Sequence, residues 1–152
     1  KNFLEKNNSK YKKIINELID KSEKIEKYSS PFDIVYGHND LLAANFIKKN
    51  RKIYLVDWEY AGYNTPLFDL GGLSSNNNFN KKEDIIMLEN YFDKKISNSL
   101  LNKYYCLKTA SLLRETMWSM VAELISTIDF NYKDYTIQNL ENFRKAFQKL
   151  NI

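Results

Sequence analysis

The sequence has few of the residues that mark several classes of protein. Four glycines and two prolines in 152 residues exclude a collagen-like chain and a proline-rich linker. The single cysteine, Cys106, excludes a disulfide scaffold and a cysteine-based zinc site, and it fits a reducing compartment. The single histidine, His38, excludes a histidine-rich metal site. No apolar run approaches the roughly 18 residues of a membrane span, and no signal peptide is recognisable, so we expect a cytoplasmic protein.

The composition is that of one folded domain over residues 1–152. Apolar residues make up 43% of the chain and aromatic residues 14%, which is enough for one sizeable core. The formal net charge is +4, carried by 20 lysines and 3 arginines that are mixed with acidic residues. Nucleic-acid readers usually have a clustered, arginine-rich basic face. The charge pattern therefore disfavours a nucleic-acid partner.

Apolar residues recur at helical spacing in four segments. The predicted helices cover residues 9–28, 82–94, 98–128 and 134–150. Ser9 is a candidate cap for the first of them. The apolar stripe of the third helix includes Leu124 and Ile128, and that of the fourth includes Ile137, so these side chains are expected to face inward.

Short apolar runs between the helices predict strands. The run over 32–36 predicts a buried strand. Two more strands, over 45–47 and 53–56, flank a lysine-rich polar turn and predict a hairpin. Residues 60–66 are predicted as a loop. A polar, asparagine-rich stretch follows, so we expect residues 60–79 to be mobile.

The residues around the predicted hairpin form a candidate site for phosphoryl transfer. Asp40 lies in a polar loop, Asn45 follows five residues later, and Asp57 lies just past the second hairpin strand. Asn45 and Asp57 offer the hard oxygen ligands that Mg²⁺ prefers. Asp40 remains free to orient a substrate hydroxyl and accept its proton. Kinases divide the work in this way, because positioning and charge neutralisation supply most of their catalysis.

Each of these residues also has a simpler interpretation. His38 alone is more often a hydrogen-bonded structural histidine than a catalyst. Asp40 alone would be a turn residue and Asp57 a cap, and only their joint spacing with Asn45 favours a site. Trp118 lies in a helical apolar stripe, so the pattern alone predicts a core residue.

The motif His-x-Asp-x4-Asn, followed by an aspartate at a strand end, resembles that of the aminoglycoside phosphotransferase and choline kinase superfamily. These are protein-kinase-like enzymes that phosphorylate small molecules. The string VDWEYAGYNTPLFDLG over 56–71 is similar to the choline/ethanolamine kinase branch, especially the bacterial LicA type. Residues 118–121 and 125–135 resemble the same branch. The resemblance covers residues 32–150.

The resemblance implies roles for individual residues. Asp40 would be the catalytic base, and Asn45 and Asp57 would be the Mg²⁺ ligands. His38 would brace the loop by hydrogen bonding. Asp69 would hold the same loop from the following helix.

The family's choline site has aromatic and acidic walls. A quaternary ammonium has no proton to donate, so cation–π attraction to aromatic faces recognises it. Tyr60, Trp118 and Tyr135 fall on matching positions. Glu115 stands where eukaryotic members have a second tryptophan and would serve as an anionic wall. Asn76 replaces an acidic residue of those members.

The expected fold is α+β and mainly helical, the C-terminal lobe of a protein-kinase-like fold, with a short β-hairpin carrying the catalytic loop. The expected function is transfer of the γ-phosphoryl of ATP to choline, with Mg²⁺ bound. Alternatives are a kinase for ethanolamine, an aminoglycoside or thiamine, or a catalytically silent amine-binding module.

The family also has an N-terminal lobe with a glycine-rich nucleotide loop. Only 37 residues precede His38, and they are mostly predicted helix with no glycine before Gly37. We therefore expect this N-terminal lobe to be missing from the 152 residues. We expect it to be the structural partner with which they form a complete kinase. Little or no kinase activity is expected of the 152 residues alone.

Overall fold

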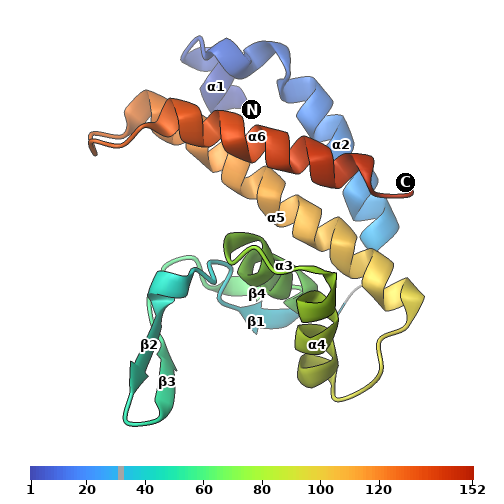
Figure 1. Ribbon diagram of the computed structural model, residues 1–152. Coiled ribbons are helices and arrows are strands. Elements are labelled where there is room, and N and C mark those ends of the chain that lie inside the picture. Colours follow the sequence, from blue (N-terminus) through green and yellow to red (C-terminus); the bar gives the residue numbers. More distant parts are fainter. Residues whose placement is uncertain (31–32) are drawn as a thin grey trace.

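The computed structural model describes residues 1–30 and 33–152 (Figure 1). Its elements follow along the chain as α1 (Asn2–Lys6), the 3-10 helix η1 (Lys10–Lys13), α2 (Ile15–Ser29), β1 (Val35–Gly37), the 3-10 helix η2 (Ala43–Asn45), β2 (Phe46–Lys49), β3 (Lys52–Leu55), β4 (Gly62–Asn64), α3 (Pro66–Asn76), α4 (Lys81–Phe92), α5 (Asn98–Ile125) and α6 (Tyr132–Gln148). The fold is thus mainly helical with small antiparallel sheets, as the sequence predicts. Within the described residues, no helix is both long and apolar enough to cross a membrane.

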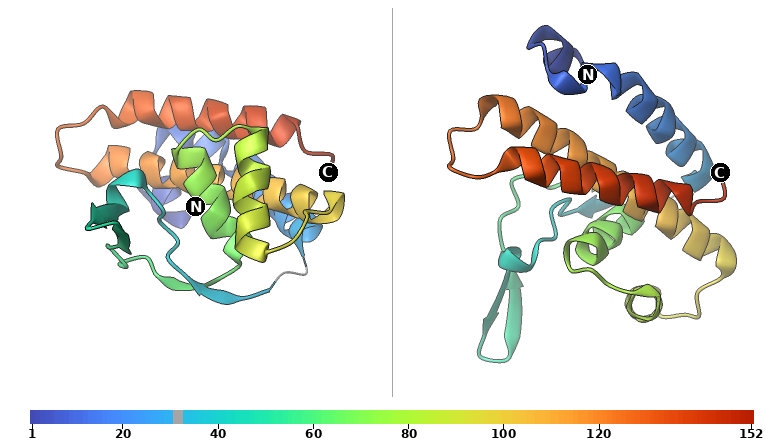
Figure 2. Two further views of the ribbon diagram at one scale, coloured as in Figure 1. Left: turned by 60° about the horizontal axis from the view of Figure 1, so that its bottom comes forward. Right: turned by 45° about the horizontal axis from the view of Figure 1, so that its top comes forward.

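The long helix α5 is the centre of the helical body. It packs against α6 and α2 on one side and against α3 on the other (Figures 1 and 2). The core is shared among these helices, because each contributes side chains that are fully buried. Examples are Leu18 of α2, Leu88 of α4, Tyr104 and Met120 of α5, and Phe143 of α6.

The strands form two separate antiparallel pairs. β1 pairs with β4, with Gly37 opposite Gly62, and β2 pairs with β3. The β2–β3 hairpin projects away from the helical body in every view (Figures 1 and 2). Asn50 and Arg51 form its turn, both with positive φ, which is the geometry of the tight turns that suit the twist of a hairpin. The predicted hairpin is confirmed with a tighter turn.

The four predicted helices are confirmed, with shifted ends. Ser9 does cap a helix, but it is η1, and α2 begins only at Ile15. α5 ends at Ile125, three residues before the predicted end, since the chain turns there toward α6. The inward orientation expected for the last apolar residues was wrong, because their side chains lie on faces that the described residues leave largely open to solvent. Leu124, Ile128 and Ile137 are 41%, 70% and 44% exposed.

The buried strand predicted over 32–36 is corrected by the structure. β1 covers Val35–Gly37, and Phe32 lies outside the described residues. Ile34 and Tyr36 are 57% and 62% exposed, because one face of this ribbon of two strands is left uncovered by the described residues. The loop predicted over 60–66 contains β4.

The segment 60–79, for which mobility is expected, is largely regular structure. Most of this segment is β4 and α3, and α3 packs closely on α5. Gly71 makes this contact possible, because a Cβ at this position would lie 2.7 Å from the backbone Cα of Lys108. The neighbouring Gly72 has open space around its Cα.

Alanine substitutions at these two glycines are predicted to change the free energy of unfolding in opposite directions. Gly71→Ala is expected to lower the free energy of unfolding by about 1–3 kcal/mol, since it forces two helix backbones apart. Gly72→Ala is the matched control and is expected to raise it by about 0.5–1 kcal/mol, because alanine is the better helix former. Urea unfolding followed by circular dichroism measures both. Equal effects of the two variants would contradict the close packing of α3 on α5.

Candidate active site

The candidate catalytic loop lies between β1 and η2, and an aspartate of α3 is hydrogen-bonded to its backbone. The Asp69 carboxylate accepts hydrogen bonds from the backbone N–H groups of His38 (2.7 Å) and Asn39 (2.6 Å). Gly37 permits this approach, because a Cβ there would lie 2.8 Å from Asp69 Oδ2. The structure therefore places Asp69 where the resemblance implies, as a clamp on the loop.

His38 lies beneath the loop and is only 2% exposed. Its Nδ1 accepts from the backbone N–H of Asp40 at 3.3 Å, and its Nε2 lies 2.9 Å from the carbonyl oxygen of Val56. This pairing requires the neutral ring with its proton on Nε2. The Trp58 ring packs edge-on against the imidazole, with centroids 4.9 Å apart. His38 thus connects the loop to the segment after β3 by hydrogen bonds on both ring nitrogens.

The two candidate Mg²⁺ ligands are brought together by Val56. The Val56 N–H donates to the carbonyl oxygen of Asn45 at 3.0 Å, so Asp57 follows directly beside Asn45. The Asn45 side-chain nitrogen donates to the Asp40 carbonyl at 2.9 Å, which leaves its Oδ1 available as a cation ligand. Asp57 is exposed and adopts a left-handed backbone conformation with φ 63°, which aspartate tolerates better than most residues. Within the described residues there is no cluster of three acidic, histidine or cysteine ligands, so water and phosphate oxygens would complete the coordination.

Asp40 has a partner that sequence reasoning missed. Arg114 of α5 lies 74 residues further along the chain, and its guanidinium donates to Asp40 Oδ1 at 2.8 Å. The Asp40 and Arg114 side chains are 15% and 34% exposed, so the pair lies at the edge of the site rather than in open solvent. The available signal was that Arg114 is one of only three arginines in a lysine-rich chain.

Arg114 also links Asp40 to the predicted substrate wall. Its guanidinium lies 3.5 Å from Glu115 Oε2 and 5.8 Å from the ring centroid of Tyr60. Glu115 in turn accepts a hydrogen bond from the Tyr135 hydroxyl at 2.7 Å. Burial, together with this bond, raises the pKa of Tyr135 to about 12, so its hydroxyl remains a donor at neutral pH. The structure thus joins Asp40, Tyr60, Glu115 and Tyr135 through one arginine.

Further aromatic residues lie beside the predicted wall residues Trp118 and Tyr135. The Phe130 ring packs edge-on against Tyr132 and Tyr135, at centroid distances of 4.9 and 5.5 Å. The Trp118 ring meets Tyr132 at 6.1 Å. Trp118 is 44% exposed, so the interpretation of this residue as core was wrong. Phe130 and Tyr132 were missed, because a connection between two helices has no periodicity to reveal which side chains converge.

Two asparagines donate hydrogen bonds to backbone carbonyl oxygens at the edge of the site. The Asn39 side chain donates to the carbonyl oxygens of Tyr60 (3.1 Å) and Gly62 (3.3 Å), and accepts from Asn64 at 2.9 Å. Asn39 thereby fixes the segment that carries Tyr60. Asn76, at the end of α3, lies beside the loop, with its side-chain nitrogen 3.5 Å from the Leu41 carbonyl oxygen.

The fold of the chain is similar to that of solved choline/ethanolamine kinases, which is protein-kinase-like. The structure of a choline/ethanolamine kinase family protein from Mesorhizobium loti is similar to 90% of this chain, with a TM-score of 0.80 and 22% identity. The profile of the choline/ethanolamine kinase family matches residues 1–83, more than half of the chain. The chain therefore belongs to the choline/ethanolamine kinase family.

Named relatives include both kinds of kinase. A LicA homologue from Mycoplasma capricolum is 35% identical over 96 residues, covering 63% of this chain and 37% of that protein. A probable ethanolamine kinase from Arabidopsis thaliana is 29% identical over 136 residues, covering 74% and 35%. A structure of LicA in complex with AMP matches 89% of this chain and 47% of its own, with a TM-score of 0.70 and 24% identity. The chain thus spans less than half the length of each of these relatives.

Proposed function

We propose that this site transfers the γ-phosphoryl group of ATP to the hydroxyl of choline, giving phosphocholine. The observation that carries the proposal is the link from the loop carboxylate to the aromatic wall through Arg114. In this proposal the cationic head of the acceptor would lie against Trp118 and Tyr135, and its hydroxyl would point to Asp40. The contacts from Asp40 through Arg114 and Glu115 to Tyr135 support this placement, because they connect the proposed proton acceptor to the proposed cation-binding wall.

The chemistry assigned to Asp40 follows from its two oxygens. Oδ1 is held by Arg114, while Oδ2 accepts no hydrogen bond within the described residues. Oδ2 is therefore the atom that would accept the hydroxyl proton as the oxygen attacks phosphorus. Arg114 fixes the orientation of the carboxylate during this step.

Asn45 and Asp57 would hold Mg²⁺. The ion would neutralise phosphate charge, and the nucleotide-bound LicA structure is consistent with nucleotide use in the family. Asn45 suits the role because its orientation is fixed by the bond to Asp40 and its side-chain oxygen remains available.

Ethanolamine is the second candidate acceptor, and a specific residue favours it. A primary ammonium can donate hydrogen bonds, and Glu115 places a carboxylate beside the aromatic wall. A quaternary ammonium would instead depend on the ring faces of Trp118 and its neighbours. The affinity ratio of choline to ethanolamine therefore reports which feature dominates.

We also propose that a second, nucleotide-binding lobe covers the strands of this chain. Tyr36 and Tyr63 are 62% and 83% exposed on the paired strands β1 and β4, with their rings edge-on at a centroid distance of 5.6 Å. Ile53, on the separate β2–β3 hairpin, is 70% exposed. Large exposed apolar side chains that lie together are typical of an interface. Phosphorylation of choline is then expected to require that lobe, whereas choline binding is not. Binding with no turnover in any longer form would instead favour a silent amine-binding module.

The proposal is tested by isothermal titration of the 152-residue chain with choline, in the absence of nucleotide. Saturable binding is expected, and Trp118→Ala is expected to weaken it by about tenfold, because it removes a ring face from the cation. Tyr91→Ala is the matched control, since Tyr91 is an exposed aromatic residue on α4 that contacts Phe92 and no site residue.

Ethanolamine titrated in parallel identifies the acceptor. Weaker binding of ethanolamine than of choline, lost in Trp118→Ala, supports the aromatic wall. Stronger binding of ethanolamine, lost in Glu115→Gln, supports the second candidate. Binding of both amines that neither variant changes would contradict the assigned wall.

A further inference from the structure

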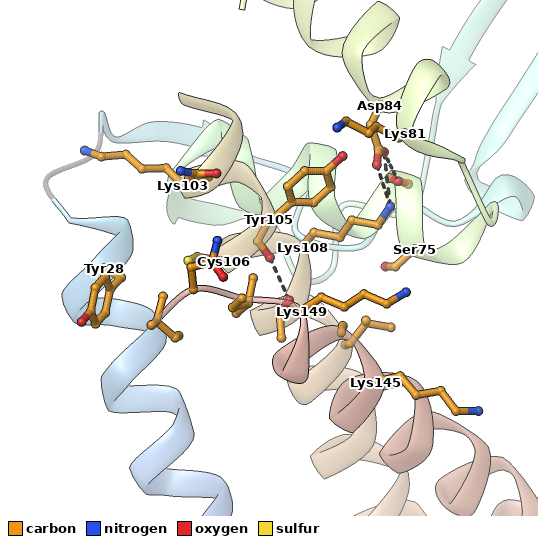
Figure 3. Close-up of a pocket in the computed structure, with 18 of the residues that line it drawn as sticks. Tyr28, Ser75, Lys81, Asp84, Lys103, Tyr105, Cys106, Lys108, Lys145 and Lys149 are labelled. Carbon is orange, nitrogen blue, oxygen red and sulfur yellow. Dashed lines mark hydrogen bonds and ion pairs between the residues drawn. The ribbon is translucent and has the colours of Figure 1, made fainter. Parts of the chain in front are cut away.

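A second cavity lies away from the catalytic loop. It occupies about 1110 Å³ between the α3–α4 connection, the first half of α5 and the end of α6 (Figure 3). None of the residues assigned above to catalysis, Mg²⁺ or the amine wall lines it. Its volume is sufficient for a small organic ligand.

The lining of this cavity is strongly basic. Five lysines from α4, α5, α6 and the residue that follows α6 line it, and Figure 3 labels each of them: Lys81, Lys103, Lys108, Lys145 and Lys149. Among the described lining residues, Asp84 has the only acidic side chain. The cavity therefore has a surplus of positive charge in a chain whose overall net charge is only +4.

The single carboxylate is already neutralised. Asp84 is 1% exposed, and its oxygens accept from Lys108 Nζ at 2.9 Å, from the Tyr104 hydroxyl at 2.6 Å and from the Ser74 hydroxyl. Asp84 therefore has no charge left to attract a cation or to repel an anion.

Two of the lysines, one on α4 and one just after α6, are available to a ligand. Lys81 and Lys149 are exposed and form no ion pair with any described residue. Lys145 lies 3.5 Å from Glu141, in a pair that is exposed and weak. A ligand between α4 and α6 would therefore meet ammonium groups from both sides.

The cavity floor is partly apolar. Tyr105 and Leu112 of α5 and Leu150 after α6 line it, and the side chain of Asn78 adds a hydrogen-bonding group to the lining. This combination suits an anion that carries an organic body, because lysine binds phosphate as a point charge while the body covers the apolar surface. A recessed cavity also suits a compact anion better than an extended one such as a nucleic acid.

We propose that this cavity is a second ligand site for a phosphorylated small molecule, with the phosphate held by Lys81 and Lys149 and the organic body against Tyr105 and Leu112. The inference is independent of the proposed kinase activity, since it uses none of that site's residues. It implies that the protein can sense a phosphorylated metabolite at a distance from its catalytic loop.

The test is an NMR titration of the ¹⁵N-labelled 152-residue chain with phenyl phosphate, without Mg²⁺ or nucleotide. Saturable shifts are expected at the amides of Ser75, Asn78 and Ala146, with the catalytic loop unchanged. Inorganic phosphate is expected to shift the same amides but bind several-fold more weakly, because it lacks the apolar body.

Two double variants distinguish binding at this cavity from a general attraction of the anion to a basic protein. Lys81→Gln with Lys149→Gln is expected to weaken binding by about tenfold or more, since two charge-assisted contacts are lost. Lys48→Gln with Lys52→Gln makes the same charge change on the exposed hairpin and is expected to change affinity by about twofold or less. Thermal unfolding of both double variants checks that each is folded.

Three results would overturn the proposal. These are the absence of saturable shifts, shifts confined to the catalytic loop, and equal weakening by the two pairs of substitutions. The last would show that phenyl phosphate responds only to the overall charge of the chain.

Discussion

Asp40→Asn, introduced into a catalytically active form of the protein, is expected to lower the rate of phosphoryl transfer by about 10²–10⁴-fold. The amide is nearly the same size as the carboxylate but cannot accept the hydroxyl proton. Choline affinity is expected to remain within a few-fold, because the proposed wall of Trp118 and Tyr135 is untouched. Steady-state kinetics, together with calorimetric binding of choline, separates these two quantities.

The control for this prediction is Asp93→Asn. Asp93 is exposed, ends α4 in a left-handed conformation that asparagine also tolerates, and lies outside the site. The turnover of the Asp93→Asn variant is expected to match that of the unmodified protein. A variant at Asp40 that kept its turnover but lost its affinity would show that the carboxylate binds the acceptor rather than taking its proton.

Asp84→Ala is expected to lower the free energy of unfolding by about 3–5 kcal/mol, which is typical when one partner of a buried ion pair is removed. Asp84 anchors α4 to α5 through Lys108 and Tyr104 and to α3 through Ser74. The substitution leaves the Lys108 ammonium, whose side chain is 18% exposed, without its carboxylate. Burial and the bond to Asp84 raise the pKa of Tyr104, so its hydroxyl also remains a donor without an acceptor.

Two comparisons make the Asp84 prediction specific. Asp20→Ala, at an exposed position of α2, is expected to change stability by less than about 0.5 kcal/mol. Asp84→Asn retains an acceptor for Tyr104 and Ser74 but not the charge that Lys108 requires, so an intermediate loss is expected. Denaturant unfolding of the three variants gives the order. A loss below about 1 kcal/mol for Asp84→Ala would mean that α4 is held by its apolar face alone.

Features encoded within a few residues could be predicted from the sequence. The helical periodicity around Tyr104 and Phe143, the cap at Ser9 and the tight hairpin after Lys49 all depend on local backbone and side-chain preferences. The candidate catalytic loop was found in the same way, because Asp40, Asn45 and Asp57 lie close along the chain. The family resemblance extended this local pattern to the expectation of a kinase.

The strand burial and the segment after β4 could not be predicted. A run of apolar residues such as 34–36 predicts burial only if something covers both faces, and the two-stranded ribbon leaves one face open. The order of α3 depends on Gly71, where the backbone of α5 approaches too closely for a side chain. Neither property is visible without the neighbouring element.

The sequence by itself determined the four helices with apolar periodicity, the presence of the hairpin and the loop that carries Asp40, because these depend on neighbours in the chain. Only the tertiary structure decided which distant side chains meet. Helix packing placed Arg114 against Asp40 and Asp69 beneath His38. The same packing gathered Phe130 and Tyr132 beside Trp118, and it set lysines of α4 and α6 around one cavity. Contacts across such separations depend on how helices cross, and periodicity carries no information about that crossing.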